Sequence, residues 1–193
     1  MRNLLTLLAT SGALALAGPA QAAIGTQPYI QLDAGPSWFD TSIKGITDKF
    51  DTGWEVDGKV GTHLANTLRT ELQLGYETAD TNQAGVKGSV SNLNLMANGL
   101  FDLSRIGPLS PYIGAGLGAA RINADIFAPP IPHYDDSQWA FAWQAMTGVN
   151  WRLTDRAAVT AGYRYFDADS KTIGGFKTDH NSNLVSVGLK LAY

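Results

Sequence analysis

The chain has 193 residues, of which 45% are hydrophobic, and its formal net charge is −3 at pH 7. This mildly acidic balance excludes the basic stripe with which proteins bind nucleic acids. Because the chain has no cysteine, it has no disulfides, thiolate metal sites or Cys nucleophile, and its stability must come from the fold itself.

The segment 1–22 has the layout of a secretory signal peptide. Arg2 precedes an apolar stretch from Leu4 to Ala17, and Ala20-Gln21-Ala22 follows as a small-residue cleavage site. A transmembrane anchor is the alternative, but the stretch is shorter than the roughly 18 apolar residues that a spanning helix needs. The sequence "TSG" at 10–12 also interrupts it. We therefore expect this segment to direct export and then to be removed.

The remaining residues, 23–193, are expected to form one domain, since their number suits a single core or a single closed sheet. No stretch of them approaches the length of an apolar spanning helix, which excludes a helical membrane protein. Instead, apolar residues alternate with period two, as in β-strands, in eight segments of about ten residues. The predicted strands are 29–39, 54–64, 68–77, 89–102, 111–123, 138–153, 157–167 and 183–193.

The connections between these segments alternate in length. The links "ANT" and "TDR" are tight enough to force antiparallel hairpins, and "LSRIGPLS" is only a little longer. Longer links, rich in Asp, Gly, Lys or Pro, occupy about 40–53, 78–88, 124–137 and 168–182. Short turns at one end and long loops at the other are typical of outer-membrane barrels. The sequence thus predicts an all-β fold, an eight-stranded antiparallel up-and-down transmembrane β-barrel, with four external loops and both termini in the periplasm.

The two faces of the predicted strands differ in charge. We assign no Asp, Glu, Lys or Arg to the apolar face, which in 68–77 carries Leu72, and expect this face to contact lipid. An arginine or lysine facing lipid at the bilayer midplane costs about 2–4 kcal/mol. The charged face is assigned to the lumen, where acids and bases can pair. The predicted lumen charge network comprises Glu55, Asp57, Lys59, Arg69, Glu71, Arg121, Arg152, Arg164 and Lys190.

A soluble barrel of the lipocalin kind, with the apolar face turned inward around a ligand, is the alternative to a membrane barrel. Two features favour the membrane barrel. Aromatic residues lie mainly toward the ends of the segments, as an interfacial girdle requires. Glycines on the polar face suit a crowded interior. Eight strands enclose a lumen that side chains just fill, so a narrow ion path is the most that a pore hypothesis allows.

Three segments resemble the opacity-type, porin-like family of small outer-membrane β-barrels, relatives of the membrane domain of outer-membrane protein A. They are "PYIGAGLGAARI", "WQAMTGVNWRLTDRAAVTAGYRYF" and "HNSNLVSVGLKLAY". The resemblance covers essentially all of residues 23–193 and implies the outer membrane of a Gram-negative bacterium, with outer-membrane lipid and lipopolysaccharide as surroundings. It also implies a non-enzymatic role in envelope integrity or surface interaction, no cofactor, and an external loop ligand that stays unidentified.

In this family the last strand ends in an aromatic residue preceded by alternating apolar positions, a pattern read by the barrel assembly machinery. The resemblance therefore implies a C-terminal assembly signal in this chain. Its residues are Val185, Val187, Leu189, Leu191 and Tyr193.

The segment "HNSN" also resembles the His-x-Ser-Asn segment of lipid A deacylase barrels. That resemblance implies an alternative in which Ser182 is the nucleophile and His180 is its base. No third residue that would orient the imidazole can be assigned from spacing, so we expect no enzyme. His133 beside Asp135 and Asp136 is weak evidence for a metal site, and none is expected.

Overall fold

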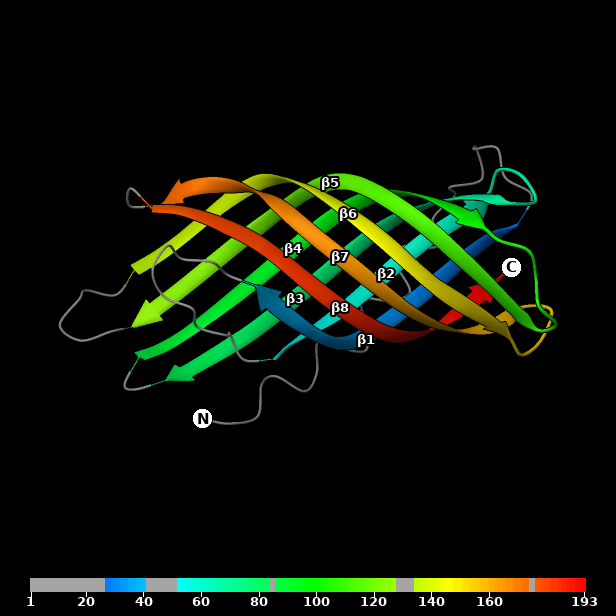
Figure 1. Cartoon of the computed structure of the whole chain (residues 1–193), viewed down its shortest axis with the longest axis horizontal. Coiled ribbons are helices and arrows are strands. Elements are labelled where there is room, and N and C mark those ends of the chain that lie inside the picture. The colour runs from blue at the N-terminus through cyan, green and yellow to red at the C-terminus, as the bar shows by residue number, and fades with distance from the viewer. Residues whose placement is uncertain (1–26, 41–51, 84–85, 128–133, 174–175) are drawn as a thin grey trace.

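The computed structural model describes residues 27–40, 52–83, 86–127, 134–173 and 176–193. Within these ranges the chain forms a closed barrel of eight strands in sequence order, each antiparallel to its neighbours (Figure 1). The strands are β1 (Pro28–Asp40), β2 (Gly53–His63), β3 (Leu68–Gln83), β4 (Val86–Asp102), β5 (Leu109–Phe127), β6 (Tyr134–Arg152), β7 (Ala157–Ile173) and β8 (Phe176–Ala192). The predicted fold class is confirmed, while the predicted signal peptide lies outside the described residues.

None of the described residues belongs to a helix that is long and apolar enough to cross a membrane.

Closure of the barrel occurs between β1 and β8. Tyr29 pairs with Ala192 and Ala34 with Val187, so the first and last strands share one ladder. Gly188 lies opposite Asp33 in this ladder, and a Cβ at Gly188 would overlap with the Asp33 carboxylate and the Leu32 carbonyl oxygen. A closed sheet leaves no edge strand, so its backbone hydrogen bonds are satisfied without water.

Most strands are longer than expected. β3 continues to Gln83 and β4 begins at Val86, and together they occupy most of the segment that was predicted to be a loop. Likewise, β5 and β6 occupy most of the predicted loop 124–137, and β7 and β8 occupy most of the predicted loop 168–182. A transmembrane strand needs only about 9–11 residues, so these hairpins run beyond the part that must cross a bilayer. Their Asp-, Gly- and Lys-rich composition is compatible with strands there, because a ladder in water needs no apolar face.

The side-chain alternation settles which face is enclosed. Leu72 is 51% exposed on the outside of the barrel, whereas its neighbour Gln73 is completely buried inside it. The same alternation continues in every strand, and the outward-facing apolar side chains include Leu32, Val56, Leu74, Leu95, Ile113, Leu117, Phe141, Val187 and Leu189. A soluble lipocalin-like barrel would bury these residues, so that alternative is wrong.

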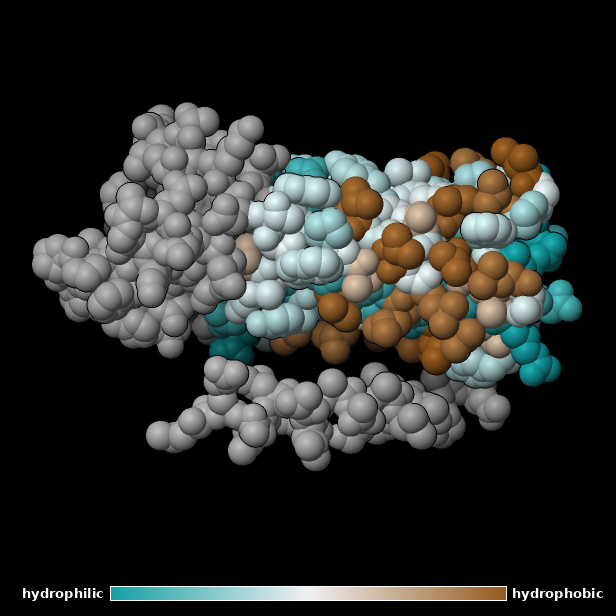
Figure 2. All heavy atoms as spheres, turned by 90° about the horizontal axis from the view of Figure 1, so that it is seen from below, coloured by the Kyte–Doolittle hydropathy of each residue, from teal (hydrophilic) through white to brown (hydrophobic). Residues whose placement is uncertain are grey.

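The outward apolar residues form a belt around the half of the barrel nearer the short turns, as the visible face in Figure 2 shows. Exposed aromatic rings border the belt. Trp54, Tyr76 and Trp139 lie toward the end with the long connections, and Phe101, Trp151 and Tyr193 toward the end with the short turns. Two such girdles are typical of the two interfaces of a bilayer.

Candidate functional site

The lumen of the barrel is polar and closely packed. Along each strand every second side chain points into the lumen. The inward positions of β1 to β4 carry most of the charged and amide side chains. Seventeen polar or charged residues are buried there and elsewhere in the described part of the chain, among them Asp33, Glu55, Asp57, Arg69, Glu77, Asn94, Gln144, Arg164 and Ser182. Buried charges are tolerated only when they are paired, so their partners decide what the lumen can do.

Arg164 on β7 is the centre of the lumen network. Its Nη1 donates to Asp57 Oδ1 at 3.1 Å, and its Nη2 forms an ion pair with Glu55. Lys59 continues the network, since its Nζ lies 2.7 Å from Asp33 Oδ2 and 3.8 Å from Asp57 Oδ2. The Arg164 contacts cross the lumen from β7 to β2, which are not adjacent in the sheet, whereas the Lys59 contacts lie within β2 and between the neighbouring strands β1 and β2.

A layer of amides lies against this group of charges. Gln73 Nε2 donates to Asp57 Oδ1 at 2.7 Å, and Gln144 Nε2 donates to Asn98 Oδ1 at 2.6 Å. Gln73 Oε1 accepts from both Asn98 and Gln144 at 3.0 Å. The layer therefore links β2, β3, β4 and β6 across the barrel axis and blocks it.

Arg69 organises the lumen nearer the short turns. Its Nε lies 2.9 Å from Asp102, and its Nη1 donates to Glu71 at 3.1 Å and to the Tyr29 hydroxyl at 3.0 Å. Tyr29 in turn donates to Glu71 at 2.5 Å. Lys190 contributes differently, since its Nζ lies 4.2 Å above the centre of the Tyr29 ring.

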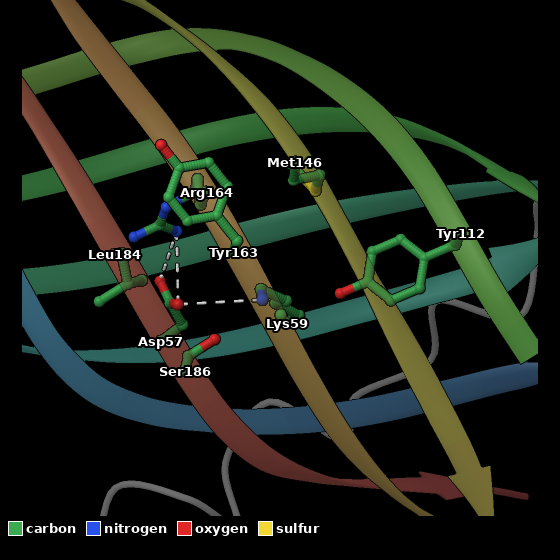
Figure 3. A pocket seen from close by; sticks show the side chains of 9 residues that line it. Asp57, Lys59, Tyr112, Met146, Tyr163, Arg164, Leu184 and Ser186 are labelled. Atoms are coloured by element: carbon green, nitrogen blue, oxygen red, sulfur yellow. Dashed lines mark hydrogen bonds and ion pairs between the residues drawn. The ribbon is translucent and has the colours of Figure 1, made fainter. Parts of the chain in front are cut away.

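Only small spaces remain between the charged groups. A cavity of about 20 Å³ lies beside Asp57, Lys59 and Arg164, with the Tyr112 hydroxyl directed toward it (Figure 3). This volume suits a single water molecule, and the polar lining would hold one. A larger hollow of about 310 Å³ opens at the short-turn end, between the turns that join β4 to β5 and β6 to β7.

Of the nine residues of the predicted network, the structure encloses seven in the barrel; Arg121 and Arg152 are exposed. Arg121 is exposed and shares the outward face of β5 with Ile113 and Leu117, so the assignment of an uncharged outer face was wrong. Counting positions along "IGAGLGAAR" places Arg121 on the apolar parity. It lies beside Trp139, toward the loop end of the belt, where a charge near the interface costs only about 0–1 kcal/mol.

Arg152 is also exposed, at the last position of β6. Its parity is inward, but at that position the strand has reached the mouth of the barrel. Arg152 therefore lines the hollow at the short-turn end and makes no contact with the central charges.

Ser182 lies inside the barrel, 1% exposed, and its hydroxyl donates to Glu77 Oε2 at 3.4 Å. Lipid surrounds the outside of the sheet, so this burial separates the hydroxyl from the esters of a membrane lipid. His180 lies two residues before Ser182 on β8 and has the same parity. Its side chain lies outside the described residues.

The residues of the predicted assembly signal all point outward, with Val187 60% and Tyr193 76% exposed.

Metal-binding side chains do not converge in the described ranges, where no three His, Asp or Glu residues could hold an ion together. The side chains of Asp135 and Asp136 and all of His133 lie outside the described residues.

The sequence predicted which face of most strands lines the lumen, but several residues of the lumen hydrogen-bond network were not predicted. Tyr29, Gln73, Asn98 and Gln144 all take part in hydrogen bonds inside the lumen. Tyr29 and Gln73 had a local signal, since each shares its parity with a polar or charged residue two positions away, Gln31 and Glu71. Asn98 and Gln144 had none, because the residues two positions away from them are apolar: Met96, Leu100, Ala142 and Met146.

Residues 6–191 match the family described as the outer membrane protein beta-barrel domain. The chain belongs to this family. The prediction of a small outer-membrane barrel is thereby confirmed, and the protein is located in the outer membrane of Gram-negative bacteria. In such barrels the short turns face the periplasm, and the longer connections face the exterior.

Known proteins add three comparisons. An uncharacterized protein of Brucella abortus is 31% identical over 181 residues, a match that covers 78% of this chain and 61% of that protein, less than two thirds of its length. A putative adhesin of Rickettsia bellii is 26% identical, with 98% of this chain and 91% of that protein covered. The crystal structure of Neisserial surface protein A is similar in fold, with a TM-score of 0.64, 22% identity, and coverage of 86% and 97%.

Proposed function

We propose that this protein is a non-enzymatic surface-contact protein, which the barrel anchors in the outer membrane while its external connections bind a partner. The observation that carries the proposal is the packed lumen. Gln73 and Gln144, both completely buried, are hydrogen-bonded across the axis, and the cavity beside Arg164 holds about 20 Å³. A barrel filled in this way is suited to anchoring rather than to transport.

The extended hairpins support the same role. β5 and β6 each have 19 residues, about twice what a bilayer requires, so they raise the connection between them well above the membrane surface. Binding residues are commonly carried on loops that a rigid scaffold positions. The Rickettsia bellii relative is named as a putative adhesin, which is the role proposed here. Lipopolysaccharide around the barrel and the assembly machinery during biogenesis are the other partners that we propose.

The test is binding by intact cells. Cells that produce this barrel are expected to adhere to epithelial monolayers or matrix proteins more than cells with an empty vector. A variant in which residues 128–133 are replaced by a short Gly-Ser linker is expected to lose adhesion while its heat-dependent gel mobility stays unchanged. Equal adhesion of wild type, loop variant and vector cells would refute the surface-contact role.

The enzymatic alternative has its own test. We expect purified protein to release no fatty acid from lipid A, and Ser182→Ala to behave like the wild type, because Ser182 faces the lumen and donates to Glu77. Mass spectrometry of lipid A after incubation with each protein measures this. Deacylated lipid A that disappears with Ser182→Ala would show that catalysis belongs to the function.

A further inference from the structure

The periplasmic mouth of the barrel collects positive charge around a hollow. Four cations line this hollow of about 310 Å³: Arg105 from the β4–β5 turn, Arg152 at the end of β6, Arg156 from the β6–β7 turn, and Lys190 from β8. The carboxylates that line it are Asp102 and Asp155. Asp102 is already bound to Arg69 at 2.9 Å, which leaves Asp155 to balance the four cations.

These four cations differ from those deeper in the barrel. Lys59, Arg69 and Arg164 each form an ion pair with a buried carboxylate. Among the described residues, by contrast, none of the four cations at the mouth forms an ion pair. Lys190, partly buried at the inner end of the hollow, lies over the Tyr29 ring instead of a carboxylate. Like charges that converge on one space repel each other, and an anion in that space relieves the repulsion.

We propose that this hollow, here called the mouth site, binds a compact anion that carries phosphoryl groups. Arginine guanidinium groups bind phosphate oxygens with two parallel hydrogen bonds, and a lysine ammonium adds a point charge. The volume lies at the lower end of the range for small-molecule pockets, which suits one or two phosphoryl groups rather than a polymer.

A soluble periplasmic anion fits the position of the mouth site better than a lipid headgroup does. Lys190 projects from the inward parity of β8 and contacts Tyr29 within the lumen. Lipid headgroups surround the outside of the barrel, separated from Lys190 by the sheet itself. The site is independent of the proposed adhesion, because it lies at the opposite end of the barrel from the external connections.

Pyrophosphate is a suitable probe, titrated into the full barrel in a non-ionic maltoside detergent and followed by calorimetry. We expect saturable binding with one site per barrel. The double variant Arg105→Gln/Arg152→Gln and the variant Lys190→Gln are each expected to weaken it by roughly tenfold or more, since charge-assisted hydrogen bonds are lost. Arg121→Gln, which removes an exposed arginine from the opposite end, is the matched control and is expected to bind as the wild type does.

Assembly is checked separately by heat-dependent gel mobility. If Lys190→Gln fails to assemble, the double arginine variant decides, because its changes lie in a turn and at a strand end. Absence of saturable pyrophosphate binding, or equal affinity in all variants, overturns the proposal.

The source of the phosphoryl group is distinguished in nanodiscs. Equal pyrophosphate affinity in phosphatidylcholine and phosphatidylglycerol nanodiscs supports a soluble anion. Weaker binding in phosphatidylglycerol supports a lipid headgroup bound by the same cations.

Discussion

Replacing Leu72 by arginine is expected to destabilise the barrel by about 2–4 kcal/mol in a bilayer, because it places a charge in hydrocarbon near the middle of the apolar belt. Leu72 is the central outward position of β3 within the belt, 51% exposed, with Val60 and Ala97 as its partners on the neighbouring strands. Urea unfolding of the protein refolded in lipid vesicles, followed by tryptophan fluorescence, measures the change in the free energy of unfolding.

Leu68→Arg is the matched control, because Leu68 lies on the same strand and the same face but at the first position after the β2–β3 turn. A charge near the interface costs only about 0–1 kcal/mol, since the side chain reaches the headgroups. Both variants place an arginine on the lipid-facing side of the same strand. Any difference between their free energies of unfolding therefore reports how deep in the bilayer the arginine lies. Equal destabilisation of the two variants would contradict the proposed position of the bilayer.

Gln73, although it faces away from lipid, is not a neutral site for comparison. It is completely buried and hydrogen-bonded to Asp57, Asn98 and Gln144. An arginine there would add a further cation to a packed lumen whose acids already have partners. The alternation of the sequence identifies Gln73 as inward, but nothing local shows how tightly it is packed.

The pattern of residues was sufficient to predict the fold, because alternation with period two indicates β-strands, and a face almost free of charged residues indicates contact with lipid. The pattern did not show which face a side chain occupies where the residues of both faces are small. Between Ile113 and Arg121 the alternation is between alanine, leucine and glycine, so the face of Arg121 was assigned wrongly. The strand ends were also missed, because outside the bilayer no apolar parity marks them.

The pairing of lumen charges depends on closure and has no local signal. Thr160 donates to Asp33 at 2.6 Å across 127 positions of sequence, and Arg164 contacts Asp57 across 107. Parity shows that each of these residues faces inward. Which of them meet depends on the stagger of eight strands around the barrel, a property of the whole sheet.

Arg164→Met is expected to destabilise the barrel about as much as Leu72→Arg does. The cause is the opposite one, since this substitution removes a charge from the lumen instead of adding one to the lipid-facing belt. Arg164 is 5% exposed, and it is bound to Glu55 and Asp57, each 1% exposed. Removing one partner of a buried ion pair leaves an uncompensated charge and typically costs about 3–5 kcal/mol. Methionine keeps much of the volume, so packing changes little. The same vesicle unfolding experiment measures the loss, and Arg152→Met at the exposed mouth is the control, expected to stay within about 0.5 kcal/mol of wild type.

A second substitution separates charge from packing. In the background of Arg164→Met, changing Glu55 to glutamine removes one of the two orphaned carboxylates, and Lys59, 3.8 Å from Asp57, still offsets the other. The double variant is therefore expected to be more stable than Arg164→Met alone, although Glu55→Gln by itself destabilises the wild type. Such a reversal of sign between the two backgrounds is what a charge pair produces. If Glu55→Gln has the same effect with and without Arg164, the pair is not coupled, and the lumen is stabilised by packing rather than by compensated charge.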